Sequence, residues 1–276
     1  MSREAVIVAT ARTPIGRAYR GAFNDTDATT LGGHVVAEAV RRAGVDPGEV
    51  EDVVFGCAVQ QGTTGQNIAR FAALRAGLPD TVPGMTIDRA CSSGLMAVAA
   101  AARHIIVDGA PVTVGGGIES VSLVMNERIN YDRIGDPWQR EHYPEMATSM
   151  IETAEIVAER YGVSREVQDM YALQSQQRTA HAQAAGRYDA EIAPLATRMR
   201  VQDKATGVVS EQEVTLRLDE GNRPQTTLED LQKLKPVFKG GRYVAEGRFI
   251  TAGNASQLSD GAAALVPVLN ALGDVA

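Results

Sequence analysis

The chain has 276 residues, of which 44% are hydrophobic, and this is enough apolar material for one large α/β domain or two modest ones. It carries 34 acidic and 27 basic residues, a net charge of -7, and only four of the basic residues are lysines. Nucleic-acid binding is therefore not expected, because no basic stripe is present to neutralise a phosphate backbone.

The first 118 residues alternate between short β-rich runs and amphipathic helical runs, which predicts a mainly parallel sheet covered by helices. We expect strands at residues 5–9, 52–58, 85–87 and 111–115, and helices at residues 29–43, 67–77 and 92–108. Gly44 and Gly77 are expected to end the first two helices.

The composition changes between residues 119 and 247, where most aromatic residues lie and the helical runs are polar. Helices are expected at residues 149–161 and 164–185, the second with Ser164 as its N-cap. From residue 248 the residue pattern again resembles that of the first 118 residues. It ends in a small apolar run that Pro267 should interrupt. We therefore expect an α/β domain of residues 1–118 and 248–276 that carries an inserted domain of residues 119–247.

Membrane and secretory segments are not expected. The best uncharged apolar run, residues 90–102, is shorter than the roughly 18 residues that a membrane helix needs, and serines and a glycine interrupt it. The apolar stretch at residues 5–11 is too short for a secretory signal, so a cytoplasmic location is expected. The two cysteines, Cys57 and Cys91, cannot supply a zinc site, and no metal is expected.

Several common catalytic motifs are absent from the sequence. No lysine precedes a serine or threonine, so a phosphate-binding P-loop is excluded, and neither a H-E-x-x-H nor a G-x-S-x-G motif occurs. Three glycines at residues 115–117 follow an expected strand, but Ser120 stands where a dinucleotide fingerprint needs its third glycine. A nicotinamide cofactor is therefore not expected.

Cys91 lies where an expected strand gives way to an expected helix. Unpaired N–H groups at a helix start favour thiolate over thiol, which would make this sulfur a better nucleophile. The helix that follows is apolar on every side, as expected for a helix buried between layers, so its N-terminus should open into an enclosed site. The alternative is that Cys91 is a small buried residue without reactivity, which is how we interpret Cys57 at the end of a strand.

A nucleophilic cysteine needs a proton acceptor, and the four histidines serve this role poorly. His104 is 13 residues beyond Cys91 on the same expected helix, about 20 Å away at ~1.5 Å per residue. His34 and His181 lie within expected helices, where packing or solvation is the simpler explanation. Only His142 lies in an expected loop that would let it swing inward.

Several segments in order resemble the thiolase family, the acetyl-CoA C-acyltransferases. The matching segments are Arg12-Thr-Pro-Ile-Gly, Asp88-Arg-Ala-Cys-Ser-Ser-Gly-Leu-Met-Ala, Gly115-Gly-Gly-Ile-Glu-Ser, Glu159-Arg-Tyr-Gly-Val-Ser-Arg-Glu-Val-Gln-Asp, Thr251-Ala-Gly-Asn-Ala-Ser and Ser259-Asp-Gly-Ala-Ala-Ala. The resemblance implies a thiolase-like layered α-β-α-β-α fold with two similar halves, of which this chain holds the N-terminal half and an inserted loop domain. It also implies that the C-terminal domain is absent from the chain.

The resemblance makes Cys91 the nucleophile that carries an acyl group as a thioester in ping-pong exchange with coenzyme A, and its backbone N–H would help to stabilise the oxyanion. Family members take an activating histidine from a G-H-P segment and a second cysteine from a C-x-G segment, both in the second half. Neither segment occurs here. The chain is thus expected to be a fragment of a longer protein or a truncated product without its bases.

Coenzyme A would be a substrate, with no cofactor needed, and the resemblance assigns its contacts to the loop domain. The matching positions are Arg223 at the adenine end, Phe238 and Ala252 along the pantetheine tunnel, and Ser256 near its amide. Acetoacetyl-CoA-specific members tend to have His-Met-Gly where this chain has Ser149-Met150-Ile151. The smaller Ser149 could leave room for longer 3-oxoacyl chains, and Met150 would still line that pocket.

The leading hypothesis is an acyltransferase of fatty acid metabolism, a homodimer or homotetramer that cleaves 3-oxoacyl-CoA or condenses two acetyl-CoA. A second hypothesis is an inactive thiolase fragment that retains coenzyme A binding. A third is a redox-sensing thiol protein, which a thiolate at Cys91 would also allow. Acyl-chain length, physiological direction and oligomeric state are not fixed by the sequence.

Overall fold

The structure, a computed structural model, describes residues 3–270. The chain forms two compact units. Unit 1 comprises the residues up to Ile129, Tyr188–Gly221 and the residues from Leu258 onward, and unit 2 comprises Asn130–Arg187 and Asn222–Gln257.

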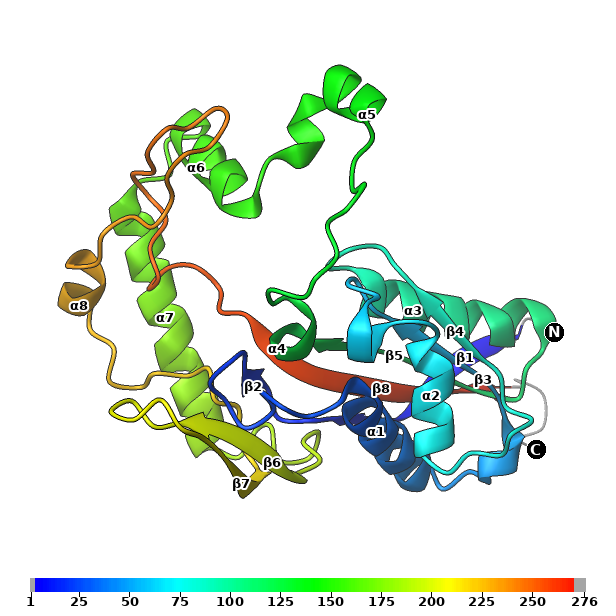
Figure 1. Cartoon of the computed structure of the whole chain (residues 1–276). Coiled ribbons are helices and arrows are strands. Elements are labelled where there is room, and N and C mark those ends of the chain that lie inside the picture. Colours follow the sequence, from blue (N-terminus) through cyan, green and yellow to red (C-terminus); the bar gives the residue numbers. More distant parts are fainter. Residues whose placement is uncertain (1–2, 271–276) are drawn as a thin grey trace. The chain divides into compact units, whose positions relative to one another are not determined.

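Unit 1 is built on a mixed sheet with the strand order β1-β8-β5-β3-β4 (Figure 1). Its strands are β1 (Glu4–Arg12), β3 (Val50–Gly56), β4 (Gly84–Ile87), β5 (Val112–Ser120) and β8 (Ser259–Asn270), and the short β2 (Gly16–Arg17) pairs with β8. Strand β3 runs parallel to β4 and β5, as predicted, whereas β8 runs antiparallel to both β5 and β1. The sequence did not reveal the direction of β8.

Strand β8 continues through Pro267, contrary to the expected interruption. Pro267 is opposite Ile7, next to a shift of register between Ile7 and Ala9 of β1. A proline has no backbone N–H to donate to a neighbouring strand, but it is tolerated at such a bulge. The irregularity therefore lets one long strand pass through the middle of the sheet.

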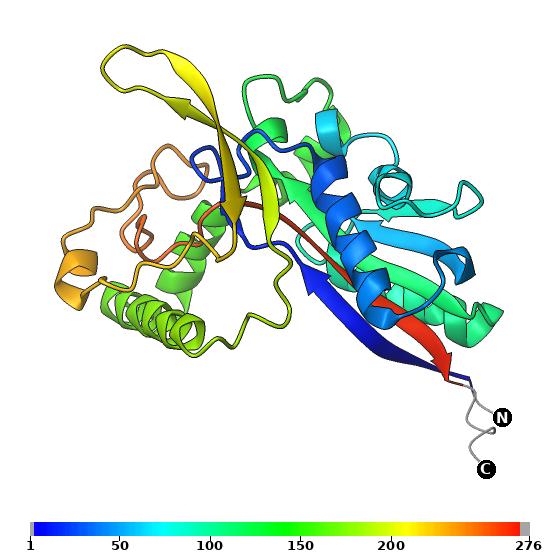
Figure 2. The ribbon, with the colours of Figure 1, turned by 90° about the horizontal axis from the view of Figure 1, so that it is seen from below.

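Helices cover both faces of this sheet, as the layered α/β prediction requires. The helices α1 (Ala28–Ala43) and α2 (Ile68–Arg75) share one hydrophobic core with Val53 and Phe55, whereas α3 (Ser93–Arg103) packs on Val54. Successive strand side chains point to opposite faces, so β3 supplies both cores. Figure 2 shows α1 lying along the sheet. It ends where predicted, with Gly44 in the left-handed conformation at φ 68°.

Helix α3 is not enclosed, contrary to the prediction of a helix buried between layers. Only Ser93, Ala97 and Ala101 of this helix are buried, and Leu95 is 75% exposed. The reason is that the sheet covers one side of the helix, while its other apolar side stays open within unit 1. With the π-helical turn η3 (His104–Asp108), the segment Ala90–Asp108 is also long and apolar enough to span a membrane. No apolar segment of this length was expected from the sequence. A mostly buried core helix of a soluble protein passes the same test of length and composition, and 22% of this window is buried.

The observed units differ from the expected boundaries at residues 118 and 247. Strand β5 extends to Ser120 and is followed by α4 (Val121–Val124), so these residues stay in unit 1. The hairpin of β6 (Leu195–Gln202) and β7 (Val209–Leu216), which was not predicted from the sequence, also belongs to unit 1. Leu195 and Leu216 are buried in the α1-side core, which fixes one end of the hairpin.

Unit 2 is mainly helical. It contains α5 (Pro137–His142), α6 (Met150–Arg160), α7 (Arg165–Ala184) and α8 (Leu228–Gln232), and α6 and α7 match the predicted helices closely. Ser164 caps α7 as predicted, since its hydroxyl accepts from the N–H of Val167 at 3.2 Å. The remaining short turns of the chain are η1 (Pro47–Glu49), η2 (Gly62–Thr64) and η4 (Pro144–Ala147).

Buried carboxylates hold the irregular part of unit 2. Glu155, 2% exposed, accepts hydrogen bonds from the backbone N–H groups of Arg248, Phe249 and Ile250 at 2.7–3.1 Å. Glu152, 3% exposed, accepts from the N–H of Tyr243 at 2.6 Å. Within the described part of the chain, no neighbouring strand accepts these backbone N–H groups of the loop. The two carboxylates accept them instead and so hold the loop against α6.

We expect Glu155→Ala to destabilise unit 2 by about 3 kcal/mol or more, because it leaves several backbone donors without an acceptor. The matched control is Glu159→Ala on the same helix, which removes an exposed ion pair with Arg248 and should cost less than about 1 kcal/mol. Urea unfolding followed by circular dichroism measures both. Equal losses in the two variants would contradict the assigned role of Glu155.

Candidate active site

Cys91 lies on the turn that joins β4 to α3, at the edge of the sheet where the parallel strands end. Its thiol is free and exposed. The preceding residue, Ala90, has a φ of 47°, a left-handed conformation that a residue with a side chain adopts only at a cost. The turn thus presents Cys91 at the surface of unit 1 through a strained backbone.

Short hydrogen bonds hold this strained turn. Asp88 Oδ1 accepts from the N–H of Ala90 at 2.7 Å. Ser93 Oγ accepts from the N–H of Arg89 at 2.7 Å and donates to the carbonyl of Ala90 at 2.6 Å. The position of Cys91 is therefore set by the residues on both sides of it.

Helix α3 begins at Ser93, slightly later than predicted, so Cys91 lies just ahead of the first turn. The N-cap residue, Ser92, does not cap with its side chain, because its hydroxyl donates to the carbonyl of Arg89 at 2.8 Å. The hydroxyl of Ser92 therefore satisfies none of the N–H groups of the first turn, whereas the N–H of Ser93 donates to the carbonyl of Ala90 at 3.1 Å. The enclosed site expected around Cys91 is not seen in unit 1, since the thiol is exposed.

Three glycines bring the start of α3 onto the ends of two strands. A Cβ on Gly56 of β3 would lie 2.1 Å from the carbonyl carbon of Ser93, and one on Gly117 of β5 would lie 3.1 Å from the Cα of Gly94. Backbone therefore packs directly on backbone at this point. The strand ends fix the first turn of α3 and, with it, the Cys91 turn.

Cys57 has the structural role that its sequence context predicted. It is 1% exposed, and burial, together with the charge of Glu119, raises the pKa of its thiol to about 12. Its Sγ lies 3.7 Å from Glu119 Oε1. Burial, followed by the charge of Asp88, also raises the pKa of Glu119, against the hydrogen bonds that Glu119 accepts. Glu119 was not predicted as a site residue from the sequence.

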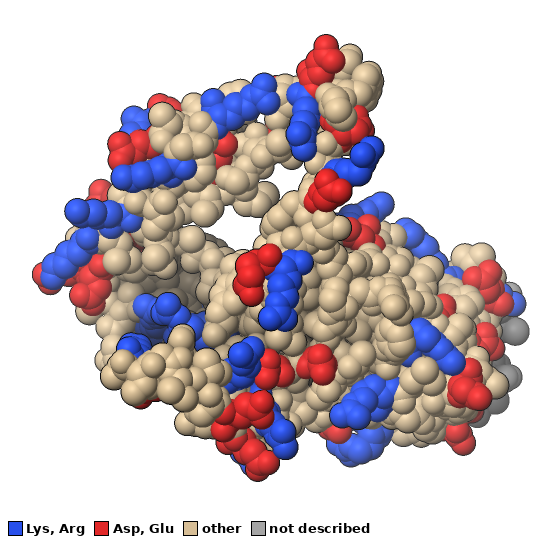
Figure 3. Space-filling view, viewed as in Figure 1, with Lys and Arg blue, Asp and Glu red and all other residues tan. Residues whose placement is uncertain are grey.

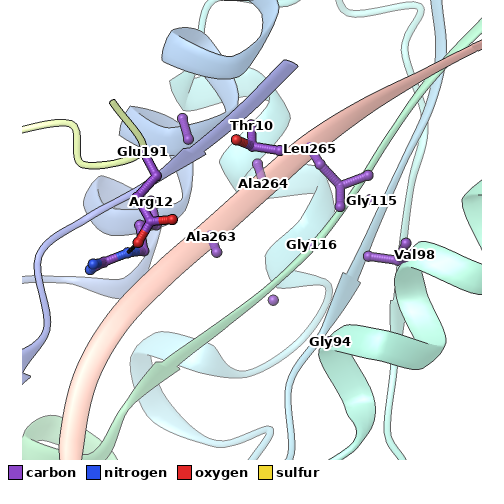
Figure 4. Close-up of a pocket in the computed structure, with 12 residues that line it drawn as sticks. Thr10, Arg12, Gly94, Val98, Gly115, Gly116, Glu191, Ala263, Ala264 and Leu265 are labelled. Carbon is purple, nitrogen blue, oxygen red and sulfur yellow. Dashed lines mark hydrogen bonds and ion pairs between the residues drawn. The ribbon is translucent and has the colours of Figure 1, made fainter. Parts of the chain in front are cut away.

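An apolar cavity of about 380 Å³ lies on the α3 side of the sheet in unit 1 (Figure 4). Small residues of β5 and β8 form its floor, and Gly94 and Val98 of α3 line it as well. Arg12 and Glu191, an ion pair at 2.8 Å, also line this cavity. The first turn after Cys91 therefore borders an open apolar hollow.

The histidines of unit 1 lie away from this turn, as predicted. His34 is on α1, where its Nε2 is 3.2 Å from the carbonyl oxygen of Ala193. His104 lies beyond the far end of α3, with Nδ1 3.9 Å from Asp52. In unit 2, His142 stacks on Trp138, and His181 is exposed on α7. His142 lies in α5 rather than in the expected loop.

Unit 2 brings two of the predicted coenzyme A contacts together. A cavity of about 330 Å³ is lined by Ser149 and Phe238, together with Glu152 and Arg242. Ser149 is the N-cap of α6, because its hydroxyl accepts from the N–H of Glu152 at 3.2 Å. Arg242 was not predicted from the sequence to line this cavity.

The other predicted contacts in unit 2 are exposed and lie on separate segments. Met150 is 78% exposed at the start of α6, so it does not line an enclosed pocket within unit 2. Ala252 and Ser256 are exposed on the loop after Thr251. Arg223 is exposed, and its backbone N–H donates to Gln176 of α7 at 2.7 Å. Cys91 belongs to unit 1 and these residues to unit 2.

Among the described residues, neither the surface charges nor the potential metal ligands mark a further binding site. On the face shown in Figure 3, basic and acidic side chains are interspersed over each unit. Among residues 3–270, no group of at least three His, Cys, Asp or Glu side chains could hold a metal ion.

Residues 5–270 match the thiolase N-terminal domain family. The chain is 41% identical over 268 residues to a 3-ketoacyl-CoA thiolase of Bacillus subtilis, and 40% identical over 264 residues to the peroxisomal 3-ketoacyl-CoA thiolase B of Mus musculus. These matches cover 96% and 95% of this chain, but 65% and 59% of the relatives. The chain thus spans about three fifths to two thirds of the length of these relatives.

Solved structures agree with the sequence matches. The acetyl-CoA acetyltransferase of Bacillus anthracis superimposes with a TM-score of 0.78 at 37% identity, over 97% of this chain and 66% of that one. Human mitochondrial 3-ketoacyl-CoA thiolase, solved in complex with CoA, gives a TM-score of 0.77 at 36% identity, over 96% and 65%. The chain therefore belongs to the thiolase family, with a thiolase-like α/β fold that corresponds to the family's N-terminal domain.

Proposed function

We propose that this chain supplies the nucleophile of a thiolase, which transfers acyl groups between coenzyme A thioesters through a thioester on Cys91. The observation that carries the proposal is the exposed, free thiol of Cys91 on a strained turn directly before α3. Strain held by surrounding hydrogen bonds is common where a turn presents a reactive group. The family membership supplies the reaction class.

In the thiolysis direction, the Cys91 thiolate would attack the 3-oxo carbonyl of a 3-oxoacyl-CoA. Cleavage of the bond between C2 and C3 leaves the shortened acyl group on Cys91, and the departing carbanion takes a proton to become acetyl-CoA. The thiol of a second coenzyme A then displaces Cys91 and gives the shortened acyl-CoA. N–H groups at the start of α3 would stabilise negative charge near the sulfur, because they form the positive end of the helix dipole.

Coenzyme A binding is supported by the relative solved in complex with CoA, and we propose unit 2 as its site. Phe238 and Ser149 share one cavity there, which supports their joint role in holding the pantetheine or acyl portion. Arg223, Ala252, Ser256 and Met150 are exposed and available for contact. Acyl-chain length, a cytoplasmic location and a homodimeric or homotetrameric state stay predictions.

The proton acceptors are proposed to come from the further length that the relatives have. His34 and His104 are occupied elsewhere in unit 1, and neither lies on the Cys91 turn. The open side of α3 and the apolar cavity beside it are surfaces that additional protein would cover. Covering them would also enclose Cys91 and exclude water from the thioester.

A second candidate function is coenzyme A binding without turnover. It is favoured by the observations that the thiol of Cys91 is exposed in unit 1 and that His34 and His104 of that unit are held away from its turn. This candidate predicts that coenzyme A binds while Cys91 accepts no acyl group.

The test is incubation of the whole chain with acetyl-CoA, followed by intact mass and by calorimetric titration of coenzyme A. We expect a gain of one acetyl group in the wild type and in Cys57→Ser, and none in Cys91→Ala, because only Cys91 is exposed. Binding without acetylation would support the second candidate. Undiminished acetylation of Cys91→Ala would remove Cys91 from the mechanism.

A further inference from the structure

Glu119 is a partly buried carboxylate at the same edge of the sheet as Cys91, and the chemistry proposed above does not use it. It is the penultimate residue of β5. Its Oε2 accepts hydrogen bonds from the N–H groups of Ala58 at 3.0 Å and Val59 at 3.3 Å, just after β3 ends. Because the backbone pairing of β3 with β5 stops at Gly56 and Gly117, this carboxylate continues the link between the two strands beyond the ladder.

The two strand ends that Glu119 joins are also the surface on which α3 begins. The Gly56 and Gly117 contacts described above leave no side chain between these strands and the first residues of α3. Glu119 lies two residues after Gly117, and its carboxylate reaches the segment after Gly56, where it also lies 3.7 Å from the Sγ of Cys57. A shift of either strand end would therefore shift the start of the helix.

The start of α3 is in turn tied to Cys91. Ser93 bonds to Arg89 and Ala90, and Asp88 bonds to Ala90, so the turn that carries Cys91 moves with the helix start. Glu119 lies close enough to Asp88 for the charge of Asp88 to act on its carboxyl group. The strand ends that Glu119 joins are thus connected to the residues on both sides of Cys91 through the packing of Gly56 and Gly117 on the start of α3.

We propose that Glu119 is a positioning residue for Cys91, which fixes the strand ends under α3 and thereby the turn that presents the thiol. The role needs a hydrogen-bond acceptor at this position rather than a negative charge. The oxygen of a glutamine side chain could accept both N–H groups, whereas alanine could accept neither. That this positioning serves acyl transfer rests on the proposed function, whereas the positioning of the Cys91 turn by Glu119 does not.

The test compares Glu119→Ala with Glu119→Gln in the whole chain, since both lose the charge and only alanine loses the acceptor. Amide hydrogen exchange is measured for the peptides that cover residues 57–66 and 89–96. We expect exchange in both peptides to be about tenfold faster in Glu119→Ala and within about twofold of wild type in Glu119→Gln. The rate at which iodoacetamide modifies Cys91 should differ at least about threefold between the two variants, with Glu119→Gln the closer to wild type.

The matched control is Asp52→Ala, which removes a partly buried carboxylate of β3 near the opposite end of the strand, beside His104. It should leave exchange at residues 89–96 unchanged. Faster exchange at residues 57–66 alone would make Glu119 a loop anchor and overturn the proposal, as would equal behaviour of the alanine and glutamine variants. If Glu119→Ala does not fold, a Glu119→Gln variant that exchanges as fast as an unfolded chain would also overturn it. None of these measurements depends on acyl transfer. Failure of this proposal can therefore be distinguished from failure of the proposed function.

Discussion

Gly56→Ala is expected to displace the start of α3 and to destabilise unit 1 by about 3 kcal/mol or more. The added Cβ would lie 2.1 Å from the carbonyl carbon of Ser93 and 2.3 Å from the backbone nitrogen of Gly94. Both are backbone atoms, so no side-chain rotation can relieve the overlap. The helix start must move, and the Cys91 turn must move with it.

Gly94→Ala provides the matched control, because Gly94 is one of the residues that Gly56 contacts. A Cβ on Gly94 would have its nearest neighbours at 3.8 and 3.9 Å, which is ordinary contact. Alanine also favours helix more than glycine does, so the net change should stay within about 1 kcal/mol. Thermal and urea unfolding, together with the rate of Cys91 alkylation, compare the two variants. Similar stability and alkylation rates in both would show that α3 is not seated on Gly56.

The contrast between these glycines shows what the sequence can and cannot predict. Gly44 was identified as a helix end because its effect is local, a left-handed residue after an amphipathic run. The role of Gly56 depends on Ser93, which is distant in sequence, and a glycine at a strand end has several possible roles. Local patterns therefore predicted the elements, whereas contacts between them needed the structure.

The burial of α3 and the β6–β7 hairpin were predicted wrongly because both depend on contacts between elements. Helix α3 was expected to be buried on all sides because its residues are apolar all round, yet burial depends on which layers surround it. The β6–β7 hairpin was missed because most of its outward residues are polar or charged, and the residues that pack on the core, Leu195, Met199, Val214 and Leu216, are few and spread out. Composition alone then assigned the hairpin to the insertion, although its packing places it in unit 1.

Only the part of the site that has a local signal in the sequence was predicted. A cysteine at a strand-to-helix junction is visible in sequence, and the structure shows Cys91 there as a free thiol. Glu119 carries no such signal, since its partners Ala58 and Val59 are 61 and 60 residues away. The buried Glu152 and Glu155 were equally hidden, because a carboxylate on a helix is usually a solvated group.

Iodoacetamide is expected to modify Cys91 and to leave Cys57 intact in the native chain between pH 7 and about pH 9. Only the thiolate reacts, and a thiol with a pKa of about 12 has roughly one part in ten thousand ionised at pH 8. Cys57 is also 1% exposed, so reagent reaches it only when the chain opens. Mass spectrometry should find one adduct per native chain and two in urea, and a Cys91→Ala chain should take up none until it unfolds.

The raised pKa of Cys57 also predicts how stability depends on alkaline pH. An unfolded cysteine ionises near pH 8.5, whereas the folded one holds its proton to about pH 12, so the folded state binds the proton more tightly. Stability from this group is complete below about pH 8 and falls as the pH rises towards 12. Cys57→Ser lacks a thiol that titrates, so its free energy of unfolding should decline less between pH 8 and pH 10 than that of the wild type. Parallel declines would mean that Cys57 ionises as easily in the folded chain as in the unfolded one, and the selective alkylation of Cys91 would then rest on exposure alone.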